Sequence, residues 1–397
     1  MARHHPVFIN NKEEARRWLN DIGVDDGAYP FLIPKAVHRC IKLTDIPCRA
    51  ANIIKQEMLS KGGDAAVSRQ ALYGDGQTDV LLMGTLKQYR LLVKKLRLQP
   101  LGLEQAAGKI EAMLANLEPA VRNLALCHGK SLVLGRETVI MGILNRTPDS
   151  FYDGGRFSQL DQAVCHACEM REQGAAIIDI GGASSRPGAE IAGEQEELER
   201  VLPLVKRLAA EDMILSIDTF RGTVAKACLD AGAHIINNIG GLQLDPALMP
   251  VMKECQAPLV LMHNRMQINA GQPYQDLIAD IIGELDIMVK DSIAAGLDAD
   301  KLIIDPGLGF GKTPAENRLL MKHLAAFKSL GKPILIGGSR KRFIGQTLNL
   351  DVDERLEGSL AILAIGILNG ADIIRVHDVK ESRRTASMID AIKNENG

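Results

Sequence analysis

Eight short, almost entirely apolar runs recur along the last two thirds of the chain, and longer amphipathic stretches separate them. The runs cover residues 139–144, 176–180, 214–217, 234–236, 258–262, 301–304, 333–336 and 372–376. A strand buried on one face alternates apolar and polar residues, whereas these runs are nearly continuous. We therefore expect strands buried on both faces, as in a parallel sheet covered by helices.

The stretches between the runs have the spacing of amphipathic helices. They cover residues 160–173, 194–210, 221–231, 246–254, 274–295, 314–329 and 353–369, and a last helix is expected at 381–393. Glycines stand where several of these helices should end, at the position that favours a left-handed backbone: Gly174, Gly232, Gly296, Gly331 and Gly370.

Eight strands, each followed by a helix, fit a closed (β/α)8 TIM barrel of about 250 residues. A doubly wound sheet would gather its ligand residues at one switch point, but here polar residues follow every strand. The predicted fold class is α/β, with a barrel at 131–397 preceded by a small α+β N-terminal domain at 1–130. In that domain we expect helices at 50–61, 85–96 and 103–126 and a strand at 80–83. No function follows from it.

Composition limits the partners and the compartment. The net charge of -2 gives no long-range attraction to nucleic acid or to an acidic membrane, and aromatic residues are too sparse, at 4%, for base stacking. The chain has neither a signal peptide nor an apolar span, so we expect a cytoplasmic protein. Seven cysteines, an odd number, argue against a disulfide framework. Cys165 and Cys168 form a CxxC pair inside a predicted helix, where packing is favoured over metal binding.

Polar residues stand at the carboxyl end of each predicted strand. In order along the chain they are Asn145, Asp179, Asp218, Asn237, His263, Asp305, Ser339 with Arg340 and Lys341, and Arg375 with His377. One such aspartate could simply cap the following helix. In a parallel barrel, however, all eight strand ends open on one face, where active sites lie. We therefore expect these residues to converge on a common mouth.

The residue types indicate a ligand. The carboxylates of Asp218 and Asp305 and the amide of Asn237 suit a flat heterocycle that presents ring N–H and amino donors. Arg186, Arg375 and His377 suit a pyrophosphate group. No GxxxxGK[ST] loop indicates a nucleoside triphosphate, and no Ser-His-Asp or Cys-His arrangement stands out. The pattern favours displacement at carbon over hydrolysis.

Over roughly residues 139–384 these motifs resemble the dihydropteroate synthase family. The segments that carry the resemblance are 141–151 (MGILNRTPDSF), 179–188 (DIGGASSRPG), 305–314 (DPGLGFGKTP), 339–345 (SRKRFIG), 355–359 (RLEGS) and 375–379 (RVHDV). Any one could arise by chance, but all six occur in order. The resemblance implies a transferase that condenses a dihydropterin pyrophosphate with p-aminobenzoate, and it implies a homodimer.

The resemblance also implies residue roles. Asn145 would bind the Mg²⁺ held by the pyrophosphate. The pterin would be held by Asp218, Asn237, Asp305 and Lys341, with Met262 beside its ring. Arg186, Arg375 and His377 would bind pyrophosphate. The p-aminobenzoate pocket would comprise Phe151, Ser185, Pro187, Phe310 and Ser339. Of these, Asp305, Lys341, Arg375 and His377 are the predicted catalytic residues.

The sequence departs from the usual family pattern at Arg146, Ala183, Ser185 and Asn238. Two other functions are therefore kept open. A pterin-dependent methyltransferase resembles the same barrel but has no need of both Arg186 and the Arg375–His377 pair. A catalytically silent pterin-binding protein would act through its N-terminal domain, and Arg146 in the first loop motivates that reading.

Overall fold

A computed structural model describes residues 3–145, 159–182, 192–266 and 271–395 of the chain. The chain forms two compact units, Met1–Ala120 and Val121–Gly397. Among the helices in these described ranges, none combines the length and the apolar character needed to span a bilayer.

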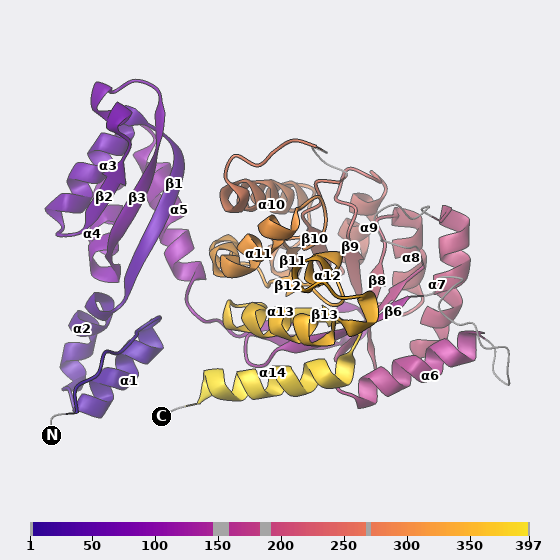
Figure 1. Cartoon of the computed structure of the whole chain (residues 1–397). Helices are drawn as coiled ribbons and strands as arrows, with labels where there is room; N and C mark the ends of the chain where they lie inside the picture. Colours follow the sequence, from indigo (N-terminus) through magenta and orange to yellow (C-terminus); the bar gives the residue numbers. More distant parts are fainter. Residues whose placement is uncertain (1–2, 146–158, 183–191, 267–270, 396–397) are drawn as a thin grey trace. The chain divides into compact units, whose positions relative to one another are not determined.

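The second unit is a parallel barrel, as the apolar runs predict (Figure 1). Its strands are β6 (Val139–Asn145), β7 (Ile177–Gly181), β8 (Ile214–Asp218), β9 (Ile235–Asn238), β10 (Leu259–Met262), β11 (Leu302–Asp305), β12 (Leu335–Ile336) and β13 (Ile373–Val376). Neighbours pair in the order β11-β10-β9-β8-β7-β6-β13-β12. A bridge between Ile304 and Ile334, just before β12, joins the two ends. The predicted (β/α)8 fold is confirmed.

Helices surround the barrel and cover the outer faces of its strands (Figure 1). They are α6 (Gln159–Glu172), α7 (Glu194–Leu208), α8 (Gly222–Asp230), α9 (Leu248–Cys255), α10 (Leu277–Ala294), α11 (Pro314–Lys322), α12 (Arg342–Leu348), α13 (Leu356–Leu368) and α14 (Val379–Asn394). All five glycines expected at helix ends have positive φ, between 65° and 111°. The helix predicted at 314–329 passes into a 3-10 helix, Leu324–Leu330, after Lys322.

A short hairpin closes the amino-terminal end of the barrel. Its strands are β4 (Arg122–Ala125) and β5 (Ser131–Leu134), and its four leucines share one apolar cluster with inward-facing barrel residues such as Ile177 and Ile303. Since side chains alternate along a strand, the residues two positions further on also face inward. Those residues are polar in most strands. The barrel interior therefore changes from aliphatic at its floor to polar at its mouth.

The first unit is α+β. Its strands β1 (His38–Pro47), β3 (Gln77–Thr85) and β2 (Asp64–Val67) form an antiparallel sheet in that order. Its helices are α1 (Lys12–Ile22), α2 (Tyr29–Ala36), α3 (Cys48–Ser60), α4 (Leu86–Leu96) and α5 (Leu103–Asn116). Side chains of α3, α4 and α5 form its core with the sheet. A capping box between Thr85 and Gln88 starts α4 where the sequence predicts it.

One predicted helix is partly wrong. The helix expected at 103–126 ends at Asn116, and β4 occupies Arg122–Ala125. Pro119 is the physical reason, because it lacks an N–H and disfavours helical backbone in the residue before it. Leu124 and Leu126, which continue the helical pattern in sequence, instead line the barrel floor.

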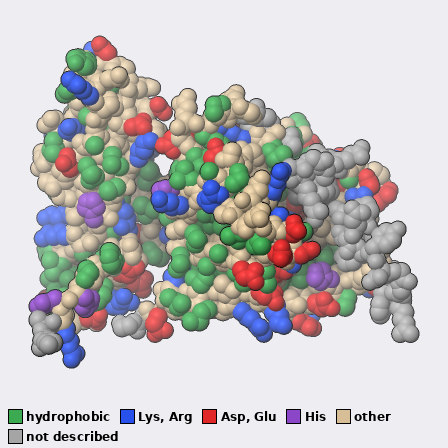
Figure 2. Space-filling model, viewed as in Figure 1, with side chains coloured by type: hydrophobic (Ala, Val, Ile, Leu, Met, Phe, Trp, Pro, Cys, Tyr) green, Lys and Arg blue, Asp and Glu red, His purple; other side chains and the backbone are tan. Residues whose placement is uncertain are grey.

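Acidic and basic side chains are interspersed on the face of the molecule shown in Figure 2. Among the described residues visible there, charges of both signs occur, in keeping with the net charge of -2.

Candidate active site

The polar layer at the barrel mouth brings together most of the predicted site residues that the structure describes. Asp218, Asn237, Met262 and Asp305 are the last or next-to-last residues of their strands, and all four are buried. Arg375 lies next to last in β13, on the same inward-facing side. This placement is consistent with the prediction from sequence that these five side chains converge on one mouth.

Arg375 links three strands. Its Nε donates to Oδ2 of Asp179 on β7 at 2.6 Å, and its Nη2 donates to Oδ2 of Asp218 on β8 at 2.8 Å. Nδ2 of Asn237 on β9 donates to the same oxygen of Asp179 at 3.1 Å. Asp179, which the sequence placed at a strand end without a role, is the centre of this network.

Burial governs the charges at the mouth. It raises the pKa of Asp218 to about 7, with the nearby Arg375 opposing the shift and Asp179 adding to it. Burial also raises the pKa of Asp305, against a hydrogen bond from the Gly307 N–H, 2.7 Å from Oδ1. Both carboxyl groups thus lose their charge more easily than ordinary aspartates.

Lys341 is held over the loop that follows β11. Its Nζ donates to the carbonyl oxygen of Leu308 at 2.8 Å and lies 4.1 Å from the centre of the Phe310 ring. Burial lowers the pKa of Lys341 to about 8, and Asp305 opposes that shift. Lys341 therefore lies beside Phe310 and within the electrostatic influence of Asp305.

Ser339 and His377 come together from the loops after β12 and β13. Oγ of Ser339 accepts a hydrogen bond from the backbone N–H of His377 at 3.2 Å and lies 3.1 Å from its Nδ1. The next residues are also joined, since Arg340 donates to both carboxylate oxygens of Asp378 at 3.0 and 2.5 Å. The two loops are thus tied into a single edge of the mouth.

Asn145 ends β6 and pairs with Gly181 of β7. A Cβ added to Gly181 would lie 3.1 Å from Oδ1 of Asn145 and 3.8 Å from Oδ2 of Asp218, so the absent side chain leaves a space between two oxygen donors. Mg²⁺ prefers oxygen ligands and commonly takes one or two from the protein and others from phosphate. Among the described residues, no cluster of three or more His, Cys, Asp or Glu could hold a metal ion. The amide oxygen of Asn145 is thus of a kind that could serve as a ligand to a magnesium ion.

Several predicted residues lie outside the described ranges. They are Phe151, Ser185, Arg186 and Pro187, together with Arg146 and Ala183 among the departures from the family pattern. Asn238 is described and buried. Its Oδ1 accepts from the N–H of Gly240 at 3.0 Å, so the amide caps this turn as a carboxylate would. Its Nδ2 has no partner among the described residues.

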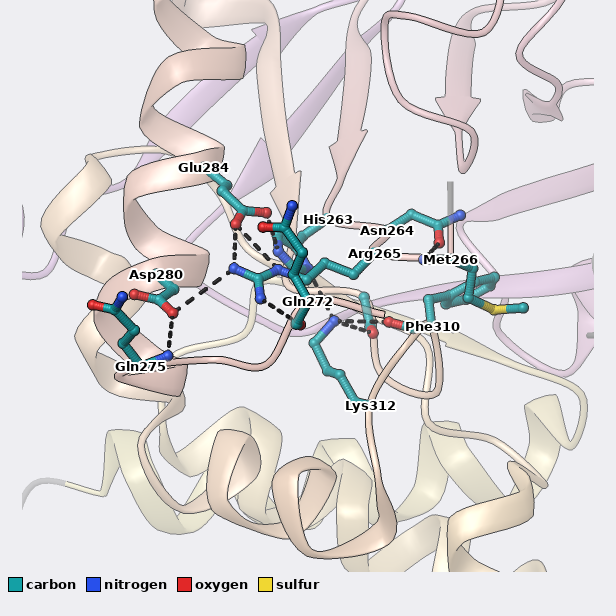
Figure 3. Close-up of polar contacts among 11 residues, drawn as sticks. His263, Asn264, Arg265, Met266, Gln272, Gln275, Asp280, Glu284, Phe310 and Lys312 are labelled. Carbon is teal, nitrogen blue, oxygen red and sulfur yellow. Dashed lines mark hydrogen bonds and ion pairs between the residues drawn. The ribbon is translucent and has the colours of Figure 1, made fainter. Parts of the chain in front are cut away.

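Sequence reasoning missed a second polar cluster beside the mouth (Figure 3). Lys312, His263, Arg265 and Glu284 join the loops after β10 and β11 to helix α10. His263 was noticed only as a strand-end residue and Lys312 only as part of a motif. Glu284 lies mid-helix, where a carboxylate ordinarily indicates a solvated face.

Comparison with known proteins agrees with the motifs. The family described as "Pterin binding enzyme" matches residues 141–377. The chain is 48% identical over 262 residues to the dihydropteroate synthase of Bacillus subtilis, an alignment that covers 66% of this chain and 90% of that protein. A probable bifunctional folylpolyglutamate synthase/dihydropteroate synthase of Halobacterium salinarum is 38% identical over 388 residues, covering 97% of this chain and 46% of that protein. The N-terminal unit is thus shared with that relative.

Solved structures show the same barrel. The Xanthomonas albilineans dihydropteroate synthase with 4-aminobenzoic acid superposes with a TM-score of 0.66 at 38% sequence identity. The superposition covers 70% of this chain and 100% of that chain. The same enzyme in complex with 7,8-dihydropteroate gives a TM-score of 0.63 at 36% identity, covering 69% and 100%. With the family match, the full-length relatives and the arrangement of strand-end residues in agreement, this chain belongs to the dihydropteroate synthase family of pterin-binding transferases in folate synthesis.

Proposed function

We propose that this chain condenses 6-hydroxymethyl-7,8-dihydropterin pyrophosphate with p-aminobenzoate to give 7,8-dihydropteroate and pyrophosphate. The observation that carries the proposal is the Arg375 network, in which a cation and the carboxylates of Asp179 and Asp218 lie at one barrel mouth. The pterin ring of this substrate presents N–H groups that need acceptors such as carboxylates, and its pyrophosphate needs a cation. Both protein groups must therefore lie within the length of one substrate molecule.

Unsatisfied buried atoms support a pterin at the centre of the mouth. Oδ1 of Asp179 and Oγ of Ser216 are buried and lack a hydrogen-bond partner among the described residues. Buried polar atoms are nearly always paired in native proteins, so a ligand or a water must supply the partner. With Asp218, Asp305 and Asn237, they offer acceptors to a ring rich in N–H groups.

The pyrophosphate would lie beside Arg375 and His377, with Arg186 as a further cation. An arginine offers a planar fork to phosphate oxygens. Asn145 would hold a Mg²⁺ ion, which when bound would neutralise charge on the pyrophosphate oxygens as the group leaves. Displacement then needs no covalent attachment to the protein.

The p-aminobenzoate would lie between Phe310 and Ser339, with Phe151, Ser185 and Pro187 completing its pocket. The arylamine is nucleophilic at neutral pH, so positioning contributes more than a general base. Its nitrogen attacks the methylene carbon of the pterin while the bond to the pyrophosphate oxygen breaks, and the protonated nitrogen then releases one proton to water. The carboxylates of Asp218 and Asp305 offset positive charge that develops on the ring and methylene carbon.

Other finer points belong to the same proposal. Charges of both signs on the visible face support small-molecule substrates rather than nucleic acid as partners. Apolar side chains exposed on α13 and α14 support a homodimer through these helices: Ile365, Leu368, Met388 and Ile392 are 42 to 62% exposed. The lack of a membrane-spanning helix among the described residues is consistent with activity in the cytoplasm.

An assay of dihydropteroate formation by the full-length chain, with and without Mg²⁺, tests the proposal. Asp305→Asn should lower kcat/KM for the pterin pyrophosphate by about 100-fold, because it removes a buried charge that contacts the ring. Asp212→Asn is the matched control, since its side chain is 98% exposed. Unchanged turnover and pterin affinity in Asp305→Asn would show that the assigned role is wrong. Tight binding of a methylfolate without pyrophosphate binding would instead indicate a methyltransferase.

A further inference from the structure

Lys312, at the end of the loop after β11, uses its ammonium group entirely within the protein (Figure 3). Its Nζ lies 2.9 Å from the carbonyl oxygen of Gly307, 3.2 Å from that of Phe310 and 3.0 Å from Nδ1 of His263. An ammonium group has three N–H donors and no acceptor. These three partners therefore account for every hydrogen bond that Lys312 can donate.

This arrangement fixes the proton on His263. Nδ1 must be unprotonated to accept from Lys312, so Nε2 carries the hydrogen and donates to Oε2 of Glu284, 2.8 Å away. Arg265 donates to the other oxygen of Glu284 through Nε at 3.1 Å. Although burial opposes it, hydrogen bonds from His263 and Arg265 lower the pKa of Glu284 to about 2. The ionised carboxylate of Glu284 on α10 thus holds one end of a series of hydrogen bonds that runs through His263 to Lys312.

The loop that Lys312 holds would not keep its shape by backbone preference alone. Gly307, Gly309 and Gly311 have φ of 71°, 82° and 65°, a conformation that costs a glycine little and gives the loop many alternatives. Lys312 ties together the carbonyl groups at the two ends of the turn, Gly307 and Phe310. Asn317 of α11 adds a second tie by accepting from the N–H of Gly309 at 2.7 Å.

The same turn carries the contacts of the proposed site. The N–H of Gly307 donates to Asp305, the carbonyl oxygen of Leu308 accepts from Lys341, and the ring of Phe310 lies beneath the ammonium of Lys341. A change in the turn would move all three together. The carbonyl groups that Lys312 holds are those of Gly307 and Phe310, which bracket this segment.

We propose that Lys312, oriented by the His263–Glu284 pair, is a positioning residue that fixes the 306–311 turn and thereby places Phe310 and Lys341 for substrate binding. This inference rests on the proposed function, since Phe310 is assigned to the p-aminobenzoate pocket. Lys312 itself does not touch substrate, because its three donors are already engaged. Burial lowers the pKa of Lys312 to about 7, and the nearby Asp305 opposes that shift.

The test compares Lys312→Met, which keeps the aliphatic stem, with Lys322→Met, the same change at an exposed position of α11. Loss of the two hydrogen bonds to the carbonyl groups of Gly307 and Phe310 frees the turn that carries the Phe310 ring. We therefore expect Lys312→Met to raise KM for p-aminobenzoate by at least about tenfold, with a smaller fall in kcat. Lys322→Met should change neither. A double-mutant cycle with Phe310→Ala should show effects that are clearly less than multiplicative, because both changes disturb the same contact.

Amide hydrogen exchange provides a readout that does not depend on catalysis. The peptide 306–313 should exchange faster in Lys312→Met than in the wild type and in Lys322→Met, while peptides from the barrel floor keep their rates. Unchanged KM and unchanged exchange in the folded variant would overturn the proposal, as would multiplicative effects in the cycle. If Lys312→Met does not fold, Lys312→Gln, which keeps two donors, decides by the same two measurements. A wild-type chain that makes no dihydropteroate would contradict the proposed function, and the exchange experiment would still decide whether Lys312 holds the turn.

Discussion

Nε of Arg375 lies 2.6 Å from Oδ2 of Asp179, joining residues that are 196 positions apart in the chain. The contact is possible because β7 and β13 both flank β6 in the barrel, so their inward-facing side chains meet across the mouth. Asp179 is completely buried and thus sets the direction in which Arg375 points. Arg375, the cation proposed to bind pyrophosphate, is therefore held in place by a carboxylate that lies in the part of the mouth proposed for the pterin.

Asp179→Asn should therefore disturb pyrophosphate binding without removing any cation. The amide keeps an acceptor but loses the charge that orients Arg375, so we expect kcat/KM for the pterin pyrophosphate to fall about 10- to 100-fold. Steady-state kinetics would measure this, with the exposed Asp212→Asn as control. A variant with wild-type kinetics would show that Arg375 holds its position without Asp179.

The pKa of Asp218 predicts an unusual dependence of stability on pH. Since burial raises its pKa to about 7 in the folded state, the folded chain binds a proton between about pH 4 and pH 7 that the unfolded chain releases. Wild-type stability should therefore rise, relative to Asp218→Asn, as the pH falls from about 7 toward 4. The gain is at most about 1.4 kcal/mol per pH unit. Urea denaturation of both proteins at several pH values would test it, and a difference that is constant or of opposite sign would contradict it.

Gly307 should not tolerate a side chain. A Cβ there would lie 1.9 Å from the carbonyl oxygen of His263, and φ is 71°. Gly129 has φ of 73° and nothing within 4 Å of the same position. Gly129→Ala should lower the free energy of unfolding by only about 1–2 kcal/mol, the cost of placing a residue with a Cβ in the left-handed conformation. Gly307→Ala should lower the free energy of unfolding by more than about 3 kcal/mol, or else displace the turn and abolish activity. Thermal unfolding and turnover of the two variants would separate these cases, and equal costs would count against the steric argument.

The hairpin before the barrel should be needed for barrel stability. Leu124 and Leu126 are 2% and 7% exposed and belong to the floor cluster. A chain starting at residue 131 loses both, which at roughly 1.5–3 kcal/mol for each buried leucine removes about 3–6 kcal/mol. A chain starting at residue 121 keeps them and should unfold cooperatively at a higher denaturant concentration. Equal midpoints for residues 121–397 and 131–397 would show that the hairpin adds little.

The barrel could be predicted from sequence because every strand is buried on both faces and is followed by a helix. The polar strand ends could be located for the same reason, since a parallel barrel sends them all to one face. In the N-terminal unit the strands β1 and β2 were missed. β1 alternates over Ile41–Thr44 as a strand buried on one face does, but a bulge between Leu43 and Ile46 interrupts the period, and β2, at 4 residues, is too short to show one.

The partners of the site residues could not be predicted in the same way. That Arg375 reaches Asp179 depends on which strands become neighbours, and that Lys312 donates to His263 depends on how a loop of three glycines turns. Neither contact follows from a repeating pattern of residue types in the sequence. The short helix α12 was missed because it directly follows Lys341, within a segment that sequence motifs assign to a loop.

Most barrel strands place an aliphatic side chain at the floor and a polar one two residues later, so the length of a strand is itself a constraint. Deleting one codon inside β8 or β11 would turn the terminal aspartate outward, against the surrounding helices, and turn the isoleucine before it into the barrel interior. Folding and ligand recognition would fail together. These strands can accept substitutions one residue at a time, but gains and losses of residues should be confined to the connections between them.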